Sequence, residues 1–420
     1  MKPRILFVSH CLPFPPHSGV TNRTYNILRQ LAKEFDVHVV AFSRRNHQPD
    51  AAARASAIAG LQRIPVTVAA AIPIGAEWSG GRRLWDHLRS VITRRAYTFY
   101  ELHSGDYRRE LRKAVVRVRP DMIHVDNVDL FRWVGELPPV PIACTYHNIE
   151  SELLRLRARH TQSPLIRYYL LHQAELVERA ERELAPRVQL NVMTSALDGD
   201  RLRALAPAAA IAVIPNGADT DYFTPPAADQ SIPGRTAFVG PIYMFANRDG
   251  VDQFVESTWP QVRAGCAGAS FEIIGRCSDE RRQFYNALPG VTAVGHVPDL
   301  RPHLAAARCA VVPLRVGGGT RLKILDAWAM GRAVVSTSLG CEGLETRDGD
   351  NILIRDTPRE FAAAVLEVLG DADRRAALER SGRATVLERY SWDVVGRQIR
   401  AAYLRLLGHD DARGARASAA

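Results

Sequence analysis

The sequence lacks most features that mark a secreted, membrane-spanning or metal-binding protein. Its six cysteines form no C-x-x-C pair and no ligand-like spacing, which disfavours a metal site built on cysteine and is typical of a reducing compartment. Its apolar runs are short, and none approaches the roughly 20 residues of a membrane-spanning helix. The first apolar run, Ile5–Val8, is too short for a signal-peptide core and is expected to be a buried strand. We therefore expect a cytoplasmic protein.

Lysine is also scarce, because only four Lys residues occur and nearly all positive charge is carried by Arg. Lys and Arg exceed Asp and Glu by eight in residues 1–200 and by two in the remainder. This excess is either a bias of composition or an attraction to an anionic membrane face or a phosphorylated acceptor. Nucleic acid is not expected as a partner, since no stacking aromatic motif, helix-turn-helix or zinc signature accompanies the basic residues.

The length of 420 residues favours two domains, and the pattern of apolar segments repeats accordingly. Strands that are apolar on both faces alternate with helical stretches, which predicts α/β domains with doubly wound parallel sheets. A stretch rich in Pro, Gly and Asp at 214–226 breaks both patterns and marks the seam. The predicted domains are residues 1–210 and 211–390, followed by a helix at 391–407 and a tail at 408–420 that we expect to be disordered. Two such Rossmann-like domains would point the carboxyl ends of their strands at an intervening cleft.

The individual elements can be placed from the same pattern. In the first half we expect strands at Ile5–Val8, Val37–Phe42, Met122–Val125, Pro141–Thr145 and Val188–Met193, with helices at Val20–Lys33 and Ile149–Leu184. In the second half we expect strands at Ala237–Gly240, Phe271–Gly275, Val291–Gly295, Cys309–Pro313, Ala333–Ser336 and Asn351–Ile354. The helices expected there are about 249–264, 279–287, 299–307, 320–330, 358–370 and 372–388.

The segment 313–332 contains the residues best suited to bind an anion. A predicted strand ends at Pro313, three glycines follow, and Thr320 is a suitable N-cap for the next helix. Glycines let backbone N–H groups approach an anion at the positive end of a helix. Arg321 and Lys323 then occupy the first turn, where the helix dipole disfavours cations unless an anion such as a diphosphate is bound. A glycine-rich cap without a ligand remains the alternative.

Asp326 is the second clue in this segment. Together with Leu322, Leu325 and Ala329 it follows the spacing of a core-facing helical stripe. A carboxylate in that stripe is costly to bury without hydrogen-bond donors, and the hydroxyls of a ribose would supply them. An internal salt bridge to Arg or Lys is the alternative.

This segment resembles the nucleotide-sugar signature of the family 4 (group 1) retaining glycosyltransferases, in particular a bacterial branch with a Gly-Gly-Gly-Thr-Arg-Leu-Lys loop. The resemblance covers most of the chain, because other matching stretches lie at 13–19, 214–223, 334–344 and 390–392. It implies the GT-B fold, with the nucleotide-sugar donor in the C-terminal domain and the acceptor in the N-terminal domain. It also implies that the last helix, 391–407, returns to the N-terminal domain.

The resemblance also implies roles for particular residues of the C-terminal domain. Asp326 falls on the second acid of the family's Glu-x7-Glu motif, which binds the ribose, whereas the first acid falls on Gly318. Gly318, Gly319 and Thr320 would bind the donor through the backbone. The family's usual Arg and Lys after the Val-Gly strand are missing here, so Arg321 and Lys323 are the expected partners of the diphosphate.

In the N-terminal domain, His147 follows a predicted strand and resembles the family histidine that touches the transferred sugar. A structural, hydrogen-bonded histidine is the alternative. Gly19 opens the first helix and resembles the family's loop beside the donor phosphates. His10, His17 and Asp126 are further polar residues that could line the cleft, but none of them is assigned a role.

The resemblance implies a hexosyltransferase of exopolysaccharide or cell-surface glycan synthesis that acts on a glycan or lipid-linked acceptor at the inner membrane face. Such an enzyme would need no cofactor, and the nucleotide sugar would be its co-substrate. No metal is expected, because fixed cations and helix N–H groups would stabilise the leaving diphosphate and the chain shows no Asp-x-Asp loop suited to a metal. Two alternatives are a sugar-nucleotide epimerase of the same fold and a basic, non-enzymatic protein that binds nucleic acid or membranes. A nicotinamide dehydrogenase is disfavoured, because no G-x-G-x-x-G follows the first strand.

Overall fold

The computed structural model describes residues 1–16, 18–317 and 321–408. The chain divides into two compact units. Unit 1 consists of Met1–Pro215 together with the segment that begins at Val395, and unit 2 is Asn216–Val394. The expected tail from residue 409 onward lies outside the described residues. No helix in the described part is long and apolar enough to span a membrane.

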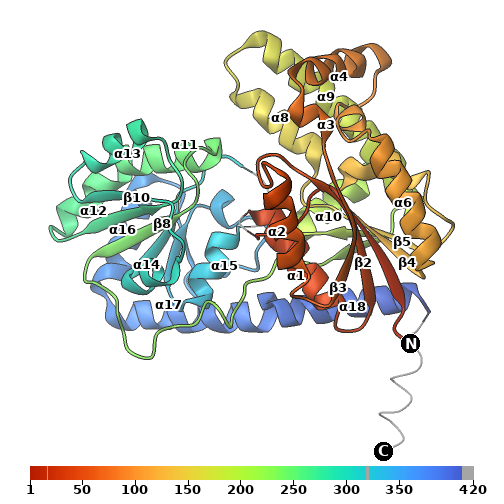
Figure 1. Cartoon of the computed structure of the whole chain (residues 1–420). Helices are drawn as coiled ribbons and strands as arrows, with labels where there is room; N and C mark the ends of the chain where they lie inside the picture. Colours follow the sequence, from red (N-terminus) through yellow and green to blue (C-terminus); the bar gives the residue numbers. More distant parts are fainter. Residues whose placement is uncertain (17, 318–320, 409–420) are drawn as a thin grey trace, which may run out of the picture. The chain divides into compact units, whose positions relative to one another are not determined.

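Unit 1 is built on a parallel sheet that lies between helices (Figure 1). Within the described residues the sheet has seven strands in the order β3-β2-β1-β4-β5-β6-β7. The strands are β1 (Arg4–Ser9), β2 (Asp36–Ser43), β3 (Val66–Pro73), β4 (Met122–Asp126), β5 (Ile142–Thr145), β6 (Leu190–Met193) and β7 (Ile211–Val213). The main helices are α1 (Gly19–Leu31), α2 (Ala51–Leu61), α3 (Gly75–Trp78), α4 (Gly80–Thr93), α6 (Gly105–Val118), α8 (Glu150–His160), α9 (Pro164–Leu184) and α10 (Ala196–Leu205). The short helices α5 (Thr98–Glu101) and α7 (Phe131–Val134) complete it.

Unit 2 repeats this architecture with a six-stranded parallel sheet, as far as the residues are described, in the order β10-β9-β8-β11-β12-β13. The strands are β8 (Arg235–Val239), β9 (Ser270–Ile274), β10 (Val291–Gly295), β11 (Cys309–Val312), β12 (Ala333–Ser336) and β13 (Leu353–Ile354). The helices are α11 (Phe245–Gln253), α12 (Trp259–Gly265), α13 (Asp279–Asn286), α14 (Arg301–Ala306), α15 (Leu322–Ala329), α16 (Pro358–Gly370) and α17 (Ala372–Thr385). Each unit has its own core of buried apolar side chains, so two domains are confirmed.

The last helix, α18 (Trp392–Leu406), begins in unit 2 and continues into unit 1. In unit 1 the Arg400 guanidinium donates to Glu34 Oε1 over 3.1 Å and to Gln30 Oε1 over 2.8 Å, both at the end of or just after α1. Tyr403 is fully buried, and its hydroxyl lies 2.5 Å from His124 Nδ1 on β4. α18 is therefore part of the unit 1 core.

Several predicted elements differ from the observed ones. The strands β3 and β7 lie in segments for which the sequence analysis expected none. The single helical stretch expected over 149–184 is wrong, because α8 ends at His160 and Pro164 opens α9. The helix expected at about 249–264 contains a π-helical segment at Phe254–Thr258 between α11 and α12. The helix expected from 320 begins at Leu322, with Arg321 as its N-cap residue.

Candidate functional site

Each sheet reverses its strand order at one point, and the candidate residues gather there. In unit 1 the reversal lies between β1 and β4, and in unit 2 it lies between β8 and β11. Open parallel sheets bind ligands beyond the carboxyl ends of the strands at such a point, because the adjacent connections leave in opposite directions. The two positions are therefore the candidate sites of the two units.

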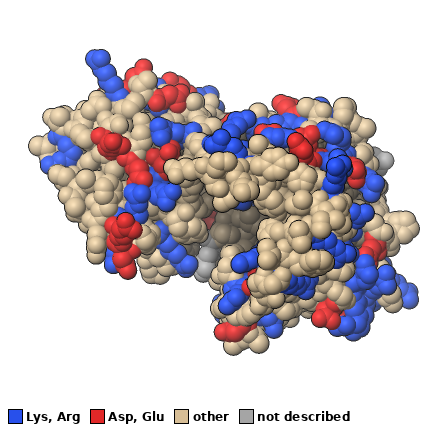
Figure 2. Space-filling model, turned by 90° about the horizontal axis from the view of Figure 1, so that it is seen from above, with Lys and Arg blue, Asp and Glu red and all other residues tan. Residues whose placement is uncertain are grey.

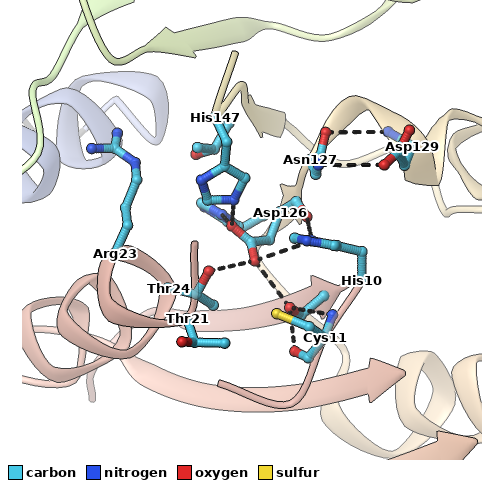
Figure 3. Close-up of polar contacts among 12 residues, drawn as sticks. His10, Cys11, Thr21, Arg23, Thr24, Asp126, Asn127, Asp129 and His147 are labelled. Carbon is cyan, nitrogen blue, oxygen red and sulfur yellow. Dashed lines mark hydrogen bonds and ion pairs between the residues drawn. The ribbon is translucent and has the colours of Figure 1, made fainter. Parts of the chain in front are cut away.

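In unit 1, Asp126 is the centre of a buried polar cluster (Figure 3). The register pairs Asp126 with Ser9 on β1 and with Thr145 on β5, so three strand ends meet at this carboxylate. Its Oδ2 accepts hydrogen bonds from Ser9 Oγ at 2.9 Å and from Thr24 Oγ1 of α1 at 2.8 Å. His147 Nε2 lies 3.3 Å from its Oδ1.

Two more histidines surround Asp126. His10 Nδ1 donates to the Asp126 carbonyl oxygen over 2.7 Å, and His124 Nε2 lies 3.8 Å from the carboxylate. Burial lowers the pKa of His10 to about 3, although Asp126 acts in the opposite direction, so the ring is neutral. Burial also lowers the pKa of His124.

The Asp126 carboxylate stays ionised in this setting. Burial by itself would raise its pKa, but the contacts with His124 and His147 hold the pKa well below its ordinary value. An ionised carboxylate that faces Nε2 of His147 favours a proton on that nitrogen and fixes the orientation of the ring. His147 is thus placed at a strand end, as expected, and Asp126 is its positioning partner.

One group within the described residues has the composition of a metal site. His10, Asp126 and His147 each offer a ligand atom, and these atoms lie within 4.8 Å of one another. His10 Nδ1 already donates to a backbone carbonyl, so that nitrogen carries a proton and is not a ligand in this arrangement. The residues as placed fit a hydrogen-bonded cluster better than a metal centre.

Gly19 occupies the predicted place at the start of α1. Ser18 caps this helix, its Oγ accepting from the Thr21 backbone N–H over 3.2 Å, and Gly19 itself is exposed. The first turn of α1 therefore presents backbone at the surface of unit 1. Its assignment to the donor phosphates stays a prediction.

In unit 2, Lys323 is the cation at the point where the strand order reverses. It lies in the first turn of α15, donates to Asn247 Oδ1 on α11 over 2.8 Å and places Nζ 4.1 Å from the centre of the Phe238 ring. Gly240 follows β8 with φ +154°, and a Cβ there would lie 2.9 Å from Lys323 Nζ, so only glycine fits. Burial, and secondarily the charge of Arg321, lowers the pKa of Lys323 to about 7.

Arg321 is placed differently from the sequence-based expectation. Its guanidinium turns back onto the chain and donates over 3.1 Å to the carbonyl oxygens of Gly317 and Leu339. The side chain is buried. Arg321 therefore shapes the loop before α15, and its contact with a diphosphate stays a prediction.

Asp326 lies one turn after Lys323 on α15 and is half-buried. Burial, together with the nearby carboxylate of Asp219, raises its pKa to about 7. In the described part of the chain the Asp326 carboxylate makes no hydrogen bond or salt bridge, so the internal ion pair considered from the sequence is not seen there. A carboxylate with this shift is suited to accept hydrogen bonds from a ligand.

Gly318, Gly319 and Thr320, the other residues predicted to bind the donor, lie outside the described residues. Gly317, the first glycine of the loop, has φ +125°. The sequence analysis missed Asn247, which orients Lys323, and Ser9, Thr24 and His124, which surround Asp126. Their position at strand ends or on an inward helical face was the available signal, but only the strand register brings them together.

Two family models match the chain, one in each unit. Residues 17–222 match the family described as Glycosyltransferase Family 4, and residues 234–371 match the family described as Glycosyl transferases group 1. Together the matches span most of the sequence. The chain thus contains a Glycosyltransferase Family 4 domain and a Glycosyl transferases group 1 domain, and its two parallel-sheet units have the GT-B fold.

Individual proteins agree with this assignment. The chain is 29% identical over 231 residues to a GDP-mannose-dependent alpha-(1-6)-phosphatidylinositol monomannoside mannosyltransferase of Mycobacterium tuberculosis, a match that covers 50% of this chain and 59% of the relative. A related mannosyltransferase of Corynebacterium glutamicum is 27% identical over 206 residues, or 44% of this chain and 54% of the relative. The chain thus spans little more than half the length of these curated relatives.

Solved structures match over nearly the whole length. Sucrose-phosphate synthase from Thermosynechococcus elongatus superposes with a TM-score of 0.69 at 18% identity, over 97% of this chain and all of that one. The Anabaena protein Alr3699/HepE in complex with UDP superposes with a TM-score of 0.67 at 15% identity, over 96% of this chain and all of that one. These similarities establish the fold.

Proposed function

We propose that this protein is a retaining hexosyltransferase that moves a sugar from a nucleotide-diphosphate sugar to a glycan or lipid-linked acceptor. The observation that carries the proposal is that Lys323 and Asp326 lie one turn apart on α15. This helix follows β11, one of the two strands between which the strand order of the unit 2 sheet reverses. Among the described residues the Asp326 carboxylate makes no hydrogen bond or salt bridge, and Lys323 lies one turn away. Such a pair suits a ligand that has phosphates at one end and a hydroxyl-bearing sugar at the other.

The donor is assigned to unit 2. In the proposal Lys323 contacts the diphosphate, and Asp326 accepts hydrogen bonds from the ribose hydroxyls. The names of related proteins support this donor class, since two curated relatives are GDP-mannose-dependent and structures of Alr3699/HepE contain UDP or UDP-glucose. The nucleotide differs among them, so either base remains a candidate for this chain.

The chemical step needs little beyond positioning and charge stabilisation. The bond between the anomeric carbon and the diphosphate oxygen breaks, the acceptor hydroxyl oxygen bonds to that carbon on the same face, and the departing diphosphate takes the hydroxyl proton. Negative charge grows on the diphosphate, and a fixed ammonium group such as that of Lys323 stabilises it. This route requires no divalent metal.

The acceptor is assigned to unit 1, and His147 to the transferred sugar. Held by Asp126, His147 presents a fixed imidazole for hydrogen bonding. The curated relatives are named for acceptors of the phosphatidylinositol monomannoside type. We therefore place this chain in exopolysaccharide or cell-surface glycan synthesis on the cytoplasmic side.

A thermal-shift screen with GDP-mannose, UDP-glucose and other sugar nucleotides tests the proposal. A ligand at about 100 times its Kd adds about 2.7 kcal/mol of stability, which is readily measured. The stabilising donor should then be consumed only when an acceptor is present. Stabilisation by no sugar nucleotide would contradict the proposal, and conversion of the donor without an acceptor would identify an epimerase instead.

A further inference from the structure

The helix α4 in unit 1 buries polar residues and exposes apolar ones. Its buried positions are the polar residues Asp86 and Ser90. Ser90 Oγ donates to the Arg95 carbonyl oxygen and accepts from Gln173 of α9, both within 2.8 Å. The opposite face carries large apolar side chains at the helical spacing 84, 85, 88, 91 and 92, and all five are exposed, Leu84 at 72%.

A second exposed apolar group lies on the first two turns of α9. Leu165 and Tyr168 are 75% and 76% exposed, and Ile166 is also exposed. The two helices lie side by side, since His87 Nδ1 of α4 is 2.5 Å from the Tyr169 hydroxyl of α9. We call Leu84, Trp85, Leu88, Ile92, Leu165 and Tyr168 the α4–α9 surface.

The segments around this surface contain many arginines and few acidic residues. Residues 79–100 contain five Arg and one acid, Asp86, which is buried and lies 3.6 Å from Arg82. The segment from Leu153 to Gln173 contains four Arg and no acid, and one of these arginines, Arg155, is paired with Glu152 and Glu178. Figure 2 views the molecule from above, the side on which Figure 1 draws α4 and α9, and shows broad uncharged areas with Lys and Arg side chains and some Asp and Glu around them.

We propose that the α4–α9 surface binds the headgroup region of an anionic lipid bilayer. Large exposed apolar side chains gathered on two adjacent helices mark an interaction site. A helix with an apolar outer face that includes Trp, flanked by arginines, is suited to lie in the plane of a bilayer, with its apolar side chains at the acyl boundary and its cations at lipid phosphates. A protein partner would need a complementary acidic rim, whereas an anionic bilayer supplies uniform negative charge.

The surface acts independently of the chemistry proposed for the donor. It involves none of the residues assigned to the nucleotide sugar or to the Asp126 cluster. Its effect would be to hold the enzyme at the plane in which a lipid-linked acceptor resides, which raises the local concentration of that acceptor.

Flotation of the full-length protein with vesicles tests this surface. One set of vesicles is phosphatidylcholine alone, and the other contains equal parts of phosphatidylcholine and phosphatidylglycerol. We expect binding to the anionic vesicles, weakened as salt is raised because the charges are screened. The fluorescence of the exposed Trp85 should shift to shorter wavelength on binding.

Two triple variants separate the charge from the apolar contribution. Replacing Arg83, Arg89 and Arg94 by Gln should weaken partitioning by about 100-fold, since each basic residue near an anionic surface contributes a factor of about five. Replacing Leu84, Trp85 and Leu88 by Gln should weaken it by at least about tenfold. All six side chains are exposed, so the variants should fold.

Matched controls lie elsewhere in the chain. The exposed arginines 109, 112 and 117 of α6, changed to Gln, remove the same charge and should leave binding within about threefold. Equal loss in the α6 control, or unchanged binding in both α4 variants, would overturn the proposal. The proposal would also be overturned if the wild-type protein did not bind anionic vesicles and was an oligomer that the apolar variant converted to a monomer. In that case the surface would be an interface between copies of this chain.

Discussion

Lys323 and Asp326 have pKa values displaced toward neutrality from opposite directions. The pKa of Lys323 falls from 10.5 to about 7, through burial and then the charge of Arg321, so this side chain loses its proton as the pH rises above about 7. The pKa of Asp326 rises from 3.8 to about 7, through burial and then Asp219, so this carboxylate gains a proton as the pH falls below about 7. The form with a charged ammonium and a charged carboxylate is therefore most abundant near neutral pH.

The donor kcat/KM should follow a bell-shaped pH profile with its maximum near pH 7. This parameter reports the ionisation of the free enzyme, and the proposed donor contacts need Lys323 protonated and Asp326 ionised. The measurement is initial rates at low donor and saturating acceptor across the pH range. Asp326→Asn should flatten the acid limb and leave the alkaline one. A kcat/KM profile that is level between about pH 5.5 and 8.5 would show that neither group titrates in this range in the free enzyme.

Single substitutions should separate the roles of the two residues. Lys323→Ala should lower kcat by about 100-fold or more, because it removes charge stabilisation that grows in the transition state. Asp326→Ala should chiefly raise the donor KM, which is the result of losing an interaction present equally in ground and transition states. Asp326→Glu should retain donor binding. The readout is steady-state kinetics with varied donor.

Two results would reassign these residues. An unchanged kcat in Lys323→Ala would remove the ammonium from the chemical step. Loss of folding in Asp326→Glu, seen by circular dichroism, would make Asp326 a packing residue of α15 and not a ligand.

At the scale of elements, α18 contributes a buried cation to unit 1. Arg400 donates to Glu34 and Gln30 and is 8% exposed, whereas Arg397 on the same helix is exposed. Arg400→Met should lower the free energy of unfolding of unit 1 by about 2 kcal/mol, the cost of losing buried hydrogen bonds to a charged group.

Hydrogen–deuterium exchange of α1 in the full chain measures this effect locally. Arg397→Met is the matched control and should change stability by less than about 0.5 kcal/mol. Equal protection of α1 in the two variants would mean that the Arg400 contacts do not stabilise unit 1.

The sequence predicts the elements better than it predicts the cluster around Asp126. Strands β1, β2, β4 and β5 were found because they are mostly apolar on both faces, as is typical of buried parallel strands. β3 begins Val-Thr-Val-Ala and is only partly buried, so its weaker pattern was missed. The seam between the units was predicted within a few residues of Pro215, because Pro, Gly and Asp interrupt both periodicities.

The polar networks depend on register, which a linear sequence does not display. Nothing local to Asp126 shows that it lies opposite Ser9, because the pairing joins residues 117 apart. His147 was found through the family resemblance, and Lys323 and Asp326 through their unusual helical positions. Asn247 was missed, because an amide in a first helical turn is ordinary until Lys323 is seen to bind it.

At the scale of the whole molecule, transfer should persist in excess chelator. The proposed charge stabilisation uses fixed groups of unit 2, with Lys323 as the main one. The assay is sugar transfer with and without a chelator, with and without added magnesium, manganese or zinc. Activity lost in chelator and restored by magnesium or manganese would show that an ion neutralises the diphosphate. Restoration by zinc together with loss in His10→Ala would point to the group of His10, Asp126 and His147.

The passage of α18 from unit 2 into unit 1 also constrains biosynthesis. The unit 1 core is closed by Tyr403 and Arg400, which the ribosome adds only after all of unit 2. At about 5–20 residues per second, roughly 10–40 s separate Pro215 from the start of that final segment. During this interval the nascent unit 1 exposes the surface that α18 will cover, while unit 2 can already fold. The unit made first is therefore completed last, and it is the one that needs protection from aggregation during translation.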